Sequence, residues 1–197
     1  MIIWIMKKHF LLSQISHKLE LIYNIMTEKI KWCIDQHHKT NHYYDLYLPY
    51  EFHLRMVVQA ANDFIKLTKK ENRNDILLAA WGHDLIEDTR TSYNDVKEVL
   101  DEFAANIIYA VTNEKGKNRK ERANKKYYEG IRNTEGAVFV KLCDRIANVQ
   151  YSKMTKSRMF EMYKKENQNF TDELGWNGSP DHQYAEMFFY LFDLFKY

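Results

Sequence analysis

Glycine and proline are scarce in this chain, and that scarcity limits the folds open to it most strongly. Only six glycines and two prolines occur in 197 residues. The many short strands of a sandwich or barrel need frequent turn residues between them, so an all-β fold is disfavoured. Long segments with apolar residues at helical spacing fill the chain instead. We therefore expect an all-α protein, a bundle of roughly eight to ten helices with one sizeable core.

The apolar pattern predicts where the main helices lie. The strongest helical segments are about 50–69, 76–86, 104–111, 138–149 and 184–195. Residues 76–86 are apolar enough to form one helix that is buried nearly all round. Asp75 is the expected N-cap of that helix, and Ser92 the expected N-cap of a short helix after it. Residues 37–50 and 171–181 are expected to be loops.

Charge and composition exclude several classes of function. The net charge of +2 is too small to favour binding to nucleic acid or to a membrane surface. No apolar run approaches the roughly 20 residues of a membrane span, and the first residues lack the order of a signal peptide. Cys33 and Cys143 lie far apart and are expected to be inert thiols in a reducing compartment. These features predict a cytoplasmic protein.

Met26 is a plausible second start, which sets the expected domain boundaries. Residues 1–25 are expected to be an N-terminal extension or a peripheral helix, and residues 26–197 a single domain. The sequence leaves the oligomeric state open.

The segment from Trp81 to Thr89, WGHDLIEDT, carries the strongest chemical signal. It places four ionisable residues in an otherwise apolar helix, namely His83, Asp84, Glu87 and Asp88. A buried charge costs several kcal/mol unless it is paired or binds a metal. On one continuous helix the first and third of these residues, and the second and fourth, would be one turn apart. A metal ion held here would need further ligands from distant parts of the chain.

Two other apolar helices offer such ligands. His53 opens one helix, and Asp144 lies in another with Asn148 one turn later. A set of two histidines and two aspartates suits Mn²⁺, or Fe²⁺, Zn²⁺ or Ni²⁺, better than Ca²⁺. Taken singly, each residue has an ordinary explanation as a core histidine, an ion pair or a solvated helix end. Their combination on three apolar helices is one that chance rarely supplies. Open coordination positions on such an ion would then hold a water and a phosphate oxygen.

A basic run at 113–126 follows these helices. By default such a run is an exposed, solvated face. The alternative is that some of its cations contact the phosphates of a highly charged substrate, and the candidates are Lys115, Lys117, Arg119 and Arg122. Arginine is the better candidate because its planar guanidinium can donate to two phosphate oxygens at once.

The positions of these residues resemble a known family. His53, then His83-Asp84, then Asp144 follow the H…HD…D signature of the HD phosphohydrolase superfamily. More narrowly, HDLIEDT (83–89), AVT (110–112), KLCDRIANV (141–149) and PYEFH (49–53) resemble segments of the guanosine-tetraphosphate hydrolase domain. That domain occurs in the RelA/SpoT-type alarmone synthetase/hydrolases and in the small stand-alone hydrolases called MESH1-like. The resemblance covers about residues 30–155.

The resemblance implies an HD-domain bundle and a role for each matching residue. The implied Mn²⁺ ligands are His53, His83, Asp84 and Asp144. Glu87 and Asp88 match the pair that orients or deprotonates the attacking water, and Asn148 matches the asparagine that helps seat the nucleoside. The implied reaction is hydrolysis of the 3′-pyrophosphate of guanosine tetra- or pentaphosphate, (p)ppGpp, to GDP or GTP and pyrophosphate.

The sequence also departs from the family pattern. Leu54 replaces the proline after the first histidine, Ala147 replaces a common histidine, and QHHKTNHYYDLYL (36–48) replaces a loop with an arginine near the substrate. One alternative is therefore another nucleotide phosphohydrolase, acting on NADPH or on deoxynucleoside monophosphates. A second is a catalytically silent nucleotide-binding module. The intact pair Glu87 and Asp88 argues against that module, since a structural metal site needs no water-activating carboxylates.

Overall fold

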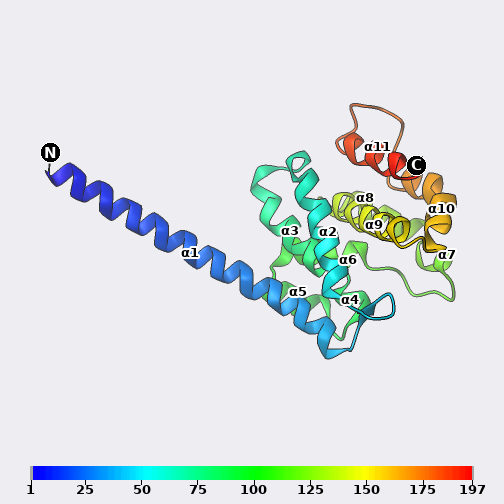
Figure 1. The fold of residues 1–197 in the computed structure, drawn as a ribbon, viewed down its shortest axis with the longest axis horizontal. Coiled ribbons are helices and arrows are strands. Elements are labelled where there is room, and N and C mark those ends of the chain that lie inside the picture. The colour runs from blue at the N-terminus through cyan, green and yellow to red at the C-terminus, as the bar shows by residue number, and fades with distance from the viewer. Residues whose placement is uncertain (1, 197) are drawn as a thin grey trace.

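A computed structural model of the chain describes residues 2–196, and the side chains of residues 20–119 and 121–196. The first helix, α1 (Ile2–Lys39), runs into the molecule from a projecting N-terminal end, and the other helices gather at its C-terminal end (Figure 1). The expected extension, residues 1–25, falls on the projecting part of α1. The side chains of its first nineteen residues lie outside the description.

The expected all-α bundle is confirmed. The described residues form nine helices of seven residues or more, together with the single-turn helices α4 and α7. After α1 the helices are α2 (Glu51–Phe64), α3 (Arg73–Gly82), α4 (Leu85–Asp88), α5 (Tyr93–Val99), α6 (Glu102–Val111), α7 (Arg119–Arg122), α8 (Lys125–Asn133), α9 (Ala137–Met154), α10 (Met159–Glu173) and α11 (Ala185–Leu194). Two 3₁₀ turns, Ile65–Leu67 and Lys70–Asn72, join α2 to α3.

Helix α9 is the centre of the bundle. It packs against α2, α3 and α6 on one side and against α8, α10 and α11 on others. Its buried residues include Phe139, Leu142 and Ile146, which belong to one continuous hydrophobic core. Because α2, α3 and α9 all meet in this core, polar side chains at their adjoining ends are brought together at one place.

The segment expected to be a loop, residues 37–50, is more ordered than predicted. Helix α1 continues to Lys39, and a small antiparallel hairpin follows, with strands β1 (Tyr43–Tyr44) and β2 (Leu48–Pro49). The hairpin is held by aromatic contacts: the ring of Tyr44 stacks on His53 and meets Tyr151 edge to face. The chain therefore folds this segment back over the start of α2.

The predicted helix 76–86 is interrupted, which corrects the sequence-based expectation. Helix α3 ends at Gly82, His83 and Asp84 follow outside any helix, and α4 restarts at Leu85. A Cβ on Gly82 would come within 2.7 Å of Ile108, so glycine lets α3 approach α6 closely at this point. Asp84, with φ −103° and ψ 4°, lies in the sparsely populated bridge region. The continuous helix assumed through His83 and Asp84 is therefore wrong, although Asp84 and Asp88 still lie one turn apart, with the N–H of Asp88 donating to the carbonyl of Asp84 at 2.9 Å.

Two other element boundaries differ from the prediction, and one predicted N-cap agrees with it. Asp75 lies in the first turn of α3 rather than at its N-cap, which is Asn72, because the preceding 3₁₀ turn leads directly into the helix. Ser92 does cap α5, in a capping box with Asp95. Helix α10 extends to Glu173, so the loop expected from residue 171 begins later.

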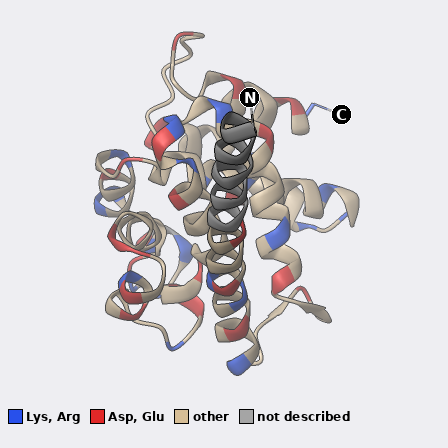
Figure 2. Cartoon of the chain, turned by 90° about the vertical axis from the view of Figure 1, so that its left-hand side faces the viewer, with Lys and Arg blue, Asp and Glu red and all other residues tan. Residues whose placement is uncertain are grey.

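The surface agrees with the modest net charge. Basic and acidic residues alternate over the view along α1, and neither sign dominates that face (Figure 2). Among the described residues, no helix combines the length and apolar character that a membrane crossing requires.

Candidate metal centre and active-site cleft

Three predicted metal ligands converge where α2, α3 and α9 meet. His53 and His83 are almost completely buried, and Asp144 is 14% exposed. One ligand atom from each residue lies within 4.8 Å of the others. The two histidine Nε2 atoms are 3.2 Å apart, and the Nε2 of His53 is 3.4 Å from the Oδ1 of Asp144. The fold thus brings together residues that are up to 91 positions apart in the sequence.

The tautomer of His83 is set by the backbone. Its Nδ1 donates a hydrogen bond to the carbonyl of Ala80 at 3.0 Å, so the Nε2 is left to face His53. Two neutral imidazole nitrogens at this distance repel unless a proton or a cation lies between them. A backbone acceptor behind a histidine is also the usual arrangement for a metal ligand. The geometry therefore fits a divalent cation bound by both nitrogens.

Asp84, the fourth predicted ligand, is not one of these three grouped residues, but it lies as close to the two histidines as Asp144 does. Its Oδ2 lies 2.8 Å from the Nε2 of His83 and 3.7 Å from that of His53. The hydroxyl of Tyr50 donates a hydrogen bond to the same oxygen. The break between α3 and α4 therefore directs Asp84 towards the histidines, while Tyr50 holds the carboxylate from the other side.

The electrostatics of the group favour a bound cation. Burial by itself lowers the pKa of His83, but the adjacent Asp84 and Asp144 outweigh it and raise that pKa to about 9. Burial likewise opposes ionisation of Asp144, yet Lys141 and the two histidines keep its pKa well below the usual value. The carboxylates therefore remain ionised and attract positive charge. A divalent ion would satisfy this demand together with the nitrogen and oxygen donors.

Asn148, the predicted nucleoside contact, is tied to the same group. Its Nδ2 donates to the Oδ1 of Asp144 at 2.5 Å, and its Oδ1 accepts from the hydroxyl of Tyr44 at 3.0 Å. Lys141 binds the other oxygen of Asp144 at 3.0 Å. The carboxylate of Asp144 is thus fixed by two neighbours on its own helix, and the hairpin reaches it through Tyr44.

The two predicted water-activating residues have different environments. Both oxygens of Glu87 accept hydrogen bonds from Asn113, which offers its side-chain amide and its backbone N–H at 2.8–3.1 Å. Asp88 is about one-third exposed, and its Oδ2 lies 3.5 Å from the Tyr50 hydroxyl and 3.9 Å from the Nε2 of His42. Burial, and then the charges of Asp84 and Glu87, raise the pKa of Asp88 to about 7. A carboxyl with such a pKa can both accept and release a proton near neutrality.

The part played by Asn113 gives a testable expectation. We expect Asn113→Ala to leave the fold intact but to lower turnover by about 10–100-fold, the range typical of residues that orient a metal centre or its ligands. Combining it with Glu87→Gln should add little, because both changes remove the same interaction. Steady-state rates of the single and double variants provide the measurement. Asn106→Ala on α6 is the control, and fully additive losses would contradict the coupling.

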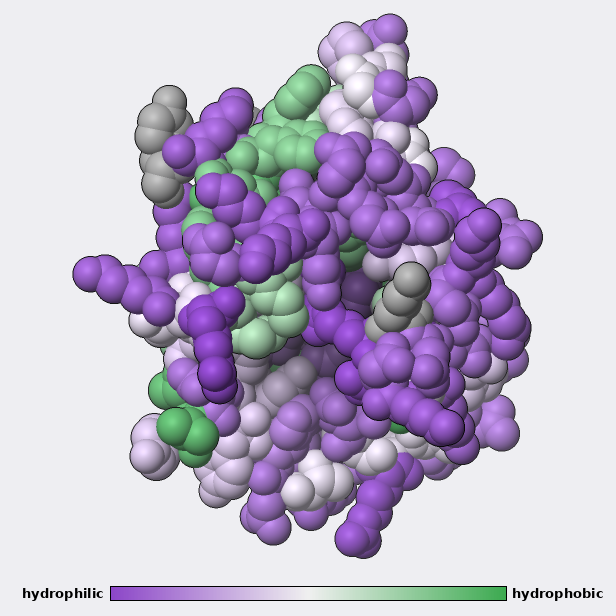
Figure 3. Space-filling model, turned by 90° about the vertical axis from the view of Figure 1, so that its right-hand side faces the viewer, coloured by the Kyte–Doolittle hydropathy of each residue, from purple (hydrophilic) through white to green (hydrophobic). Residues whose placement is uncertain are grey.

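A cleft of about 790 Å³ opens onto the metal-ligand group. Its lining includes the predicted ligands His53, Asp84 and Asp144. Glu87, Asp88 and Asn148 also line it. The opposite wall comes from α7, α8 and α10. The face that carries α7 and α10 is largely hydrophilic and hollowed near its centre (Figure 3). A cleft with polar walls and this volume is large enough for a nucleotide.

The structure divides the basic segment. Arg119 and Arg122 line the cleft, whereas Lys115 lines a neighbouring cavity and Lys117 is among the linings of neither. Sequence analysis also overlooked cations that do line the cleft, namely Lys141, Arg145 and Lys165. The ordinary explanation of Asp144, an ion pair with the adjacent Arg145, does not apply, because among the described residues Arg145 pairs with Glu166 instead.

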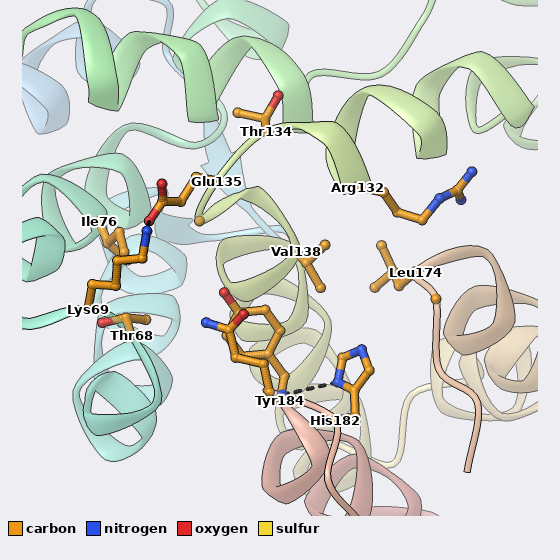
Figure 4. A pocket seen from close by; sticks show the side chains of 13 residues that line it. Thr68, Lys69, Ile76, Arg132, Thr134, Glu135, Val138, Leu174, His182 and Tyr184 are labelled. Atoms are coloured by element: carbon orange, nitrogen blue, oxygen red, sulfur yellow. Dashed lines mark hydrogen bonds and ion pairs between the residues drawn. The ribbon is translucent and has the colours of Figure 1, made fainter. Parts of the chain in front are cut away.

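A second cavity, of about 390 Å³, lies between α3, α8 and the segment before α11. Figure 4 shows two polar pairs in it: Lys69 pairs with Glu135 at 2.8 Å, and the Nδ1 of His182 accepts a hydrogen bond from the backbone N–H of Tyr184. None of the predicted ligands lies there. The cleft over the metal-ligand group is therefore the better candidate for chemistry.

Comparison with known proteins places this geometry in context. The MESH1 protein of Danio rerio, named guanosine-3′,5′-bis(diphosphate) 3′-pyrophosphohydrolase, is 25% identical over 126 residues, which are 64% of this chain and 68% of the relative. The Drosophila melanogaster protein of the same name is 28% identical over 75 residues, 38% of this chain and 42% of that relative. The chain therefore resembles the MESH1 proteins in sequence. No family model matches it.

The fold of this MESH1-like chain is also found in a solved structure. That structure, described as a metazoan ortholog of SpoT that hydrolyzes ppGpp and plays a role in starvation responses, has a TM-score of 0.64. The match covers 86% of this chain and 94% of the other at 20% identity. The expected helical bundle is therefore confirmed, and this chain shares its fold with that structure.

Proposed function

We propose that this chain hydrolyses the 3′-pyrophosphate of guanosine tetra- or pentaphosphate, releasing pyrophosphate and leaving GDP or GTP. The observation that carries the proposal is the convergence of His53, His83 and Asp144 in a nucleotide-sized cleft whose wall bears Glu87 and Asp88. The named activity of the MESH1 relatives supports the choice of substrate.

We further propose that His53, His83, Asp84 and Asp144 hold one divalent ion, with Mn²⁺ as the first choice. When bound, such an ion polarises a phosphorus–oxygen bond and lowers the pKa of water. The two histidines offer Nε2 atoms on one side, and the aspartates offer carboxylate oxygens on the other. The carboxylates also offset the charge of the ion, so the centre as a whole is compatible with a buried site.

The carboxylates on α4 would handle the proton of the attacking water. Glu87, held through both oxygens by Asn113, is positioned to orient the water. Asp88, with a pKa near neutrality, is suited to accept its proton. The water oxygen attacks the phosphorus that carries the 3′ oxygen, and the bond between that phosphorus and the 3′ oxygen breaks. The 3′ oxygen leaves as a hydroxyl, with a proton returned to it. The products are a 3′-hydroxyl nucleotide and pyrophosphate.

A panel of nucleotides tests this proposal. The full chain is incubated with Mn²⁺ and guanosine tetraphosphate, NADPH or a deoxynucleoside monophosphate, and phosphate and pyrophosphate are assayed separately. We expect pyrophosphate and GDP from the tetraphosphate, in amounts that match one another. Release of monophosphate from NADPH or from the deoxynucleotide, without pyrophosphate from the tetraphosphate, would replace the proposed function with one of the other phosphohydrolase activities.

Within the basic segment, we expect only the arginines to affect the substrate strongly. Replacing Arg119 and Arg122 with Gln should raise KM several-fold for a tetraphosphate and much less for a monophosphate, because a guanidinium can bind two phosphate oxygens. Added salt should mimic the change, since exposed charges are screened over about 8–10 Å. Replacing Lys115 and Lys117 with Gln is the matched control. Equal effects of both pairs on both substrates would reduce the segment to a general electrostatic contribution.

A further inference from the structure

Arg145 is a buried cation with no hydrogen-bond acceptor. It follows Asp144 on α9 and points towards α10, where it lines the cleft and is only 7% exposed. Its Nη1 is buried and forms no hydrogen bond, although an oxygen of Glu166 lies 3.5 Å away. An arginine carries five N–H donors and no acceptor, so burial without partners is costly.

Aromatic rings and one carboxylate compensate Arg145 only in part. The guanidinium carbon lies 4.0 Å from the ring centre of Phe170 and 4.8 Å from that of Tyr163. Such contacts stabilise a cation but fix its plane without satisfying its donors. The nearest carboxylate oxygen, from Glu166, is 3.5 Å from Nη1 and forms no hydrogen bond with it.

Glu166 is shared between two arginines. Its Oε1 lies 3.0 Å from the Nε of Arg119, and its Oε2 accepts a hydrogen bond from the same nitrogen at 3.2 Å. The ring of Tyr163 also contacts Arg119, whose guanidinium carbon is 5.6 Å from the ring centre, so one ring contacts both arginines. A single, partly exposed carboxylate thus sits beside two cations on the cleft wall, and its geometry satisfies only Arg119.

We propose that Arg145 and Arg119 form an anion subsite for a second phosphate group of the substrate, with Glu166 as an internal carboxylate that an incoming phosphate displaces. The proposal rests on the proposed function, in which one diphosphate is at the metal centre and another anionic group extends along the cleft. A phosphate presents several acceptor oxygens, which matches the paired donors of a guanidinium better than one shared carboxylate does. The aromatic rings hold Arg145 in position before the anion arrives, which lowers the cost of ordering it.

Changing Glu166 and changing Arg145 should alter the affinity for an anion in opposite directions. Removing the Glu166 charge frees both arginines, so Glu166→Gln should tighten binding of an anion. Removing the Arg145 guanidinium should weaken it. A purely structural ion pair behaves otherwise, because losing either partner then lowers stability and neither change improves binding.

The experiment is a calorimetric titration of inorganic pyrophosphate into the full chain as purified, in buffer without added metal. We expect Glu166→Gln to lower Kd at least threefold and Arg145→Gln to raise it at least fivefold. Arg145→Lys, which keeps the charge but loses the paired donors, should lie between Arg145→Gln and the unchanged chain. This variant preserves the test if the glutamine variant does not fold.

Glu173→Gln is the matched control. Glu173 lies two turns after Glu166 on the same helix and also pairs with an arginine, Arg132, but it does not line the cleft. Its neutralisation changes the net charge equally and should alter Kd less than twofold. Equal effects of the two glutamine variants, or an unchanged Kd in Arg145→Gln and Arg145→Lys, would overturn the subsite.

This outcome is separable from that of the proposed function. Pyrophosphate binding needs no turnover, so the opposite responses of the Glu166 and Arg145 variants can stand even if no nucleotide in the panel is hydrolysed. In turn, hydrolysis of guanosine tetraphosphate with kinetics unaffected by either variant would support the function and reject the subsite.

Discussion

Asp144→Ala should abolish both metal binding and hydrolysis. Asp144 is the one carboxylate in the tight group with His53 and His83, and its own neighbours Lys141 and Asn148 hold it in place. Because loss of a residue that merely supports a ligand costs about 10–100-fold, loss of the ligand itself should cost more than about 100-fold. Metal analysis of the purified protein should fall from about one divalent ion per chain to none.

A conservative variant and a stability measurement separate metal loss from misfolding. Asp144→Asn keeps the shape of the side chain but removes its charge, so it should fold and still lose the ion. Added Mn²⁺ should raise the melting temperature of the unchanged chain, since a ligand at 100 times its Kd adds about 2.7 kcal/mol. It should not do so for either variant. Asp172→Asn, on the outer side of α10, is the control, and retained metal in Asp144→Asn would refute the assignment.

Sequence analysis could single out the residues proposed as metal ligands because these polar side chains lie among apolar ones. His83 and Asp84 follow the largely apolar helix α3, and Asp144 lies in helix α9, in which ten residues are buried. Such side chains are retained in a core only when a partner compensates them. The same argument failed on geometry, since it assumed one helix through residues 76–86. The close contact at Gly82 and the break after it cannot be derived from periodicity alone.

The far wall of the cleft was not foreseen, because its helical signal is weak in the sequence. Helix α10 buries Tyr163, Asn167, Phe170 and Thr171, which follow a helical spacing but include two polar residues. A search for apolar periodicity misses such a stripe. Arg145 and Glu166 become a pair only when α9 and α10 are packed together. Sequence reasoning thus found the residues that resemble a known motif, and missed those whose role depends on tertiary contacts.

Glu87→Gln combined with Asp88→Asn should lower turnover by about 10²–10⁴-fold, the usual contribution of general acid–base catalysis, while the bound ion is retained. The ion should remain because both oxygens of Glu87 accept from Asn113, and the contacts of Asp88 among the described residues are with Tyr50 and His42, not with the proposed ligands His53 and His83. Retained metal with lost turnover would distinguish these residues from Asp144, whose variants lose both.

The single variants assign the proton. Because burial and two neighbouring carboxylates raise the pKa of Asp88, that residue is the better proton acceptor, and Asp88→Asn should remove the acid limb of the pH–rate profile. A carboxyl with a raised pKa is protonated below that pKa and then cannot accept a proton. Activity of the unchanged chain should therefore decrease as the pH is lowered through that pKa, and activity of the variant should not. Glu87→Gln should lower the rate at every pH and leave that limb in place, since its part is to orient the water. Glu98→Gln, on the exposed side of α5, is the control for a lost negative charge. Unchanged turnover in the double variant, with the ion still bound, would remove both carboxylates from the reaction.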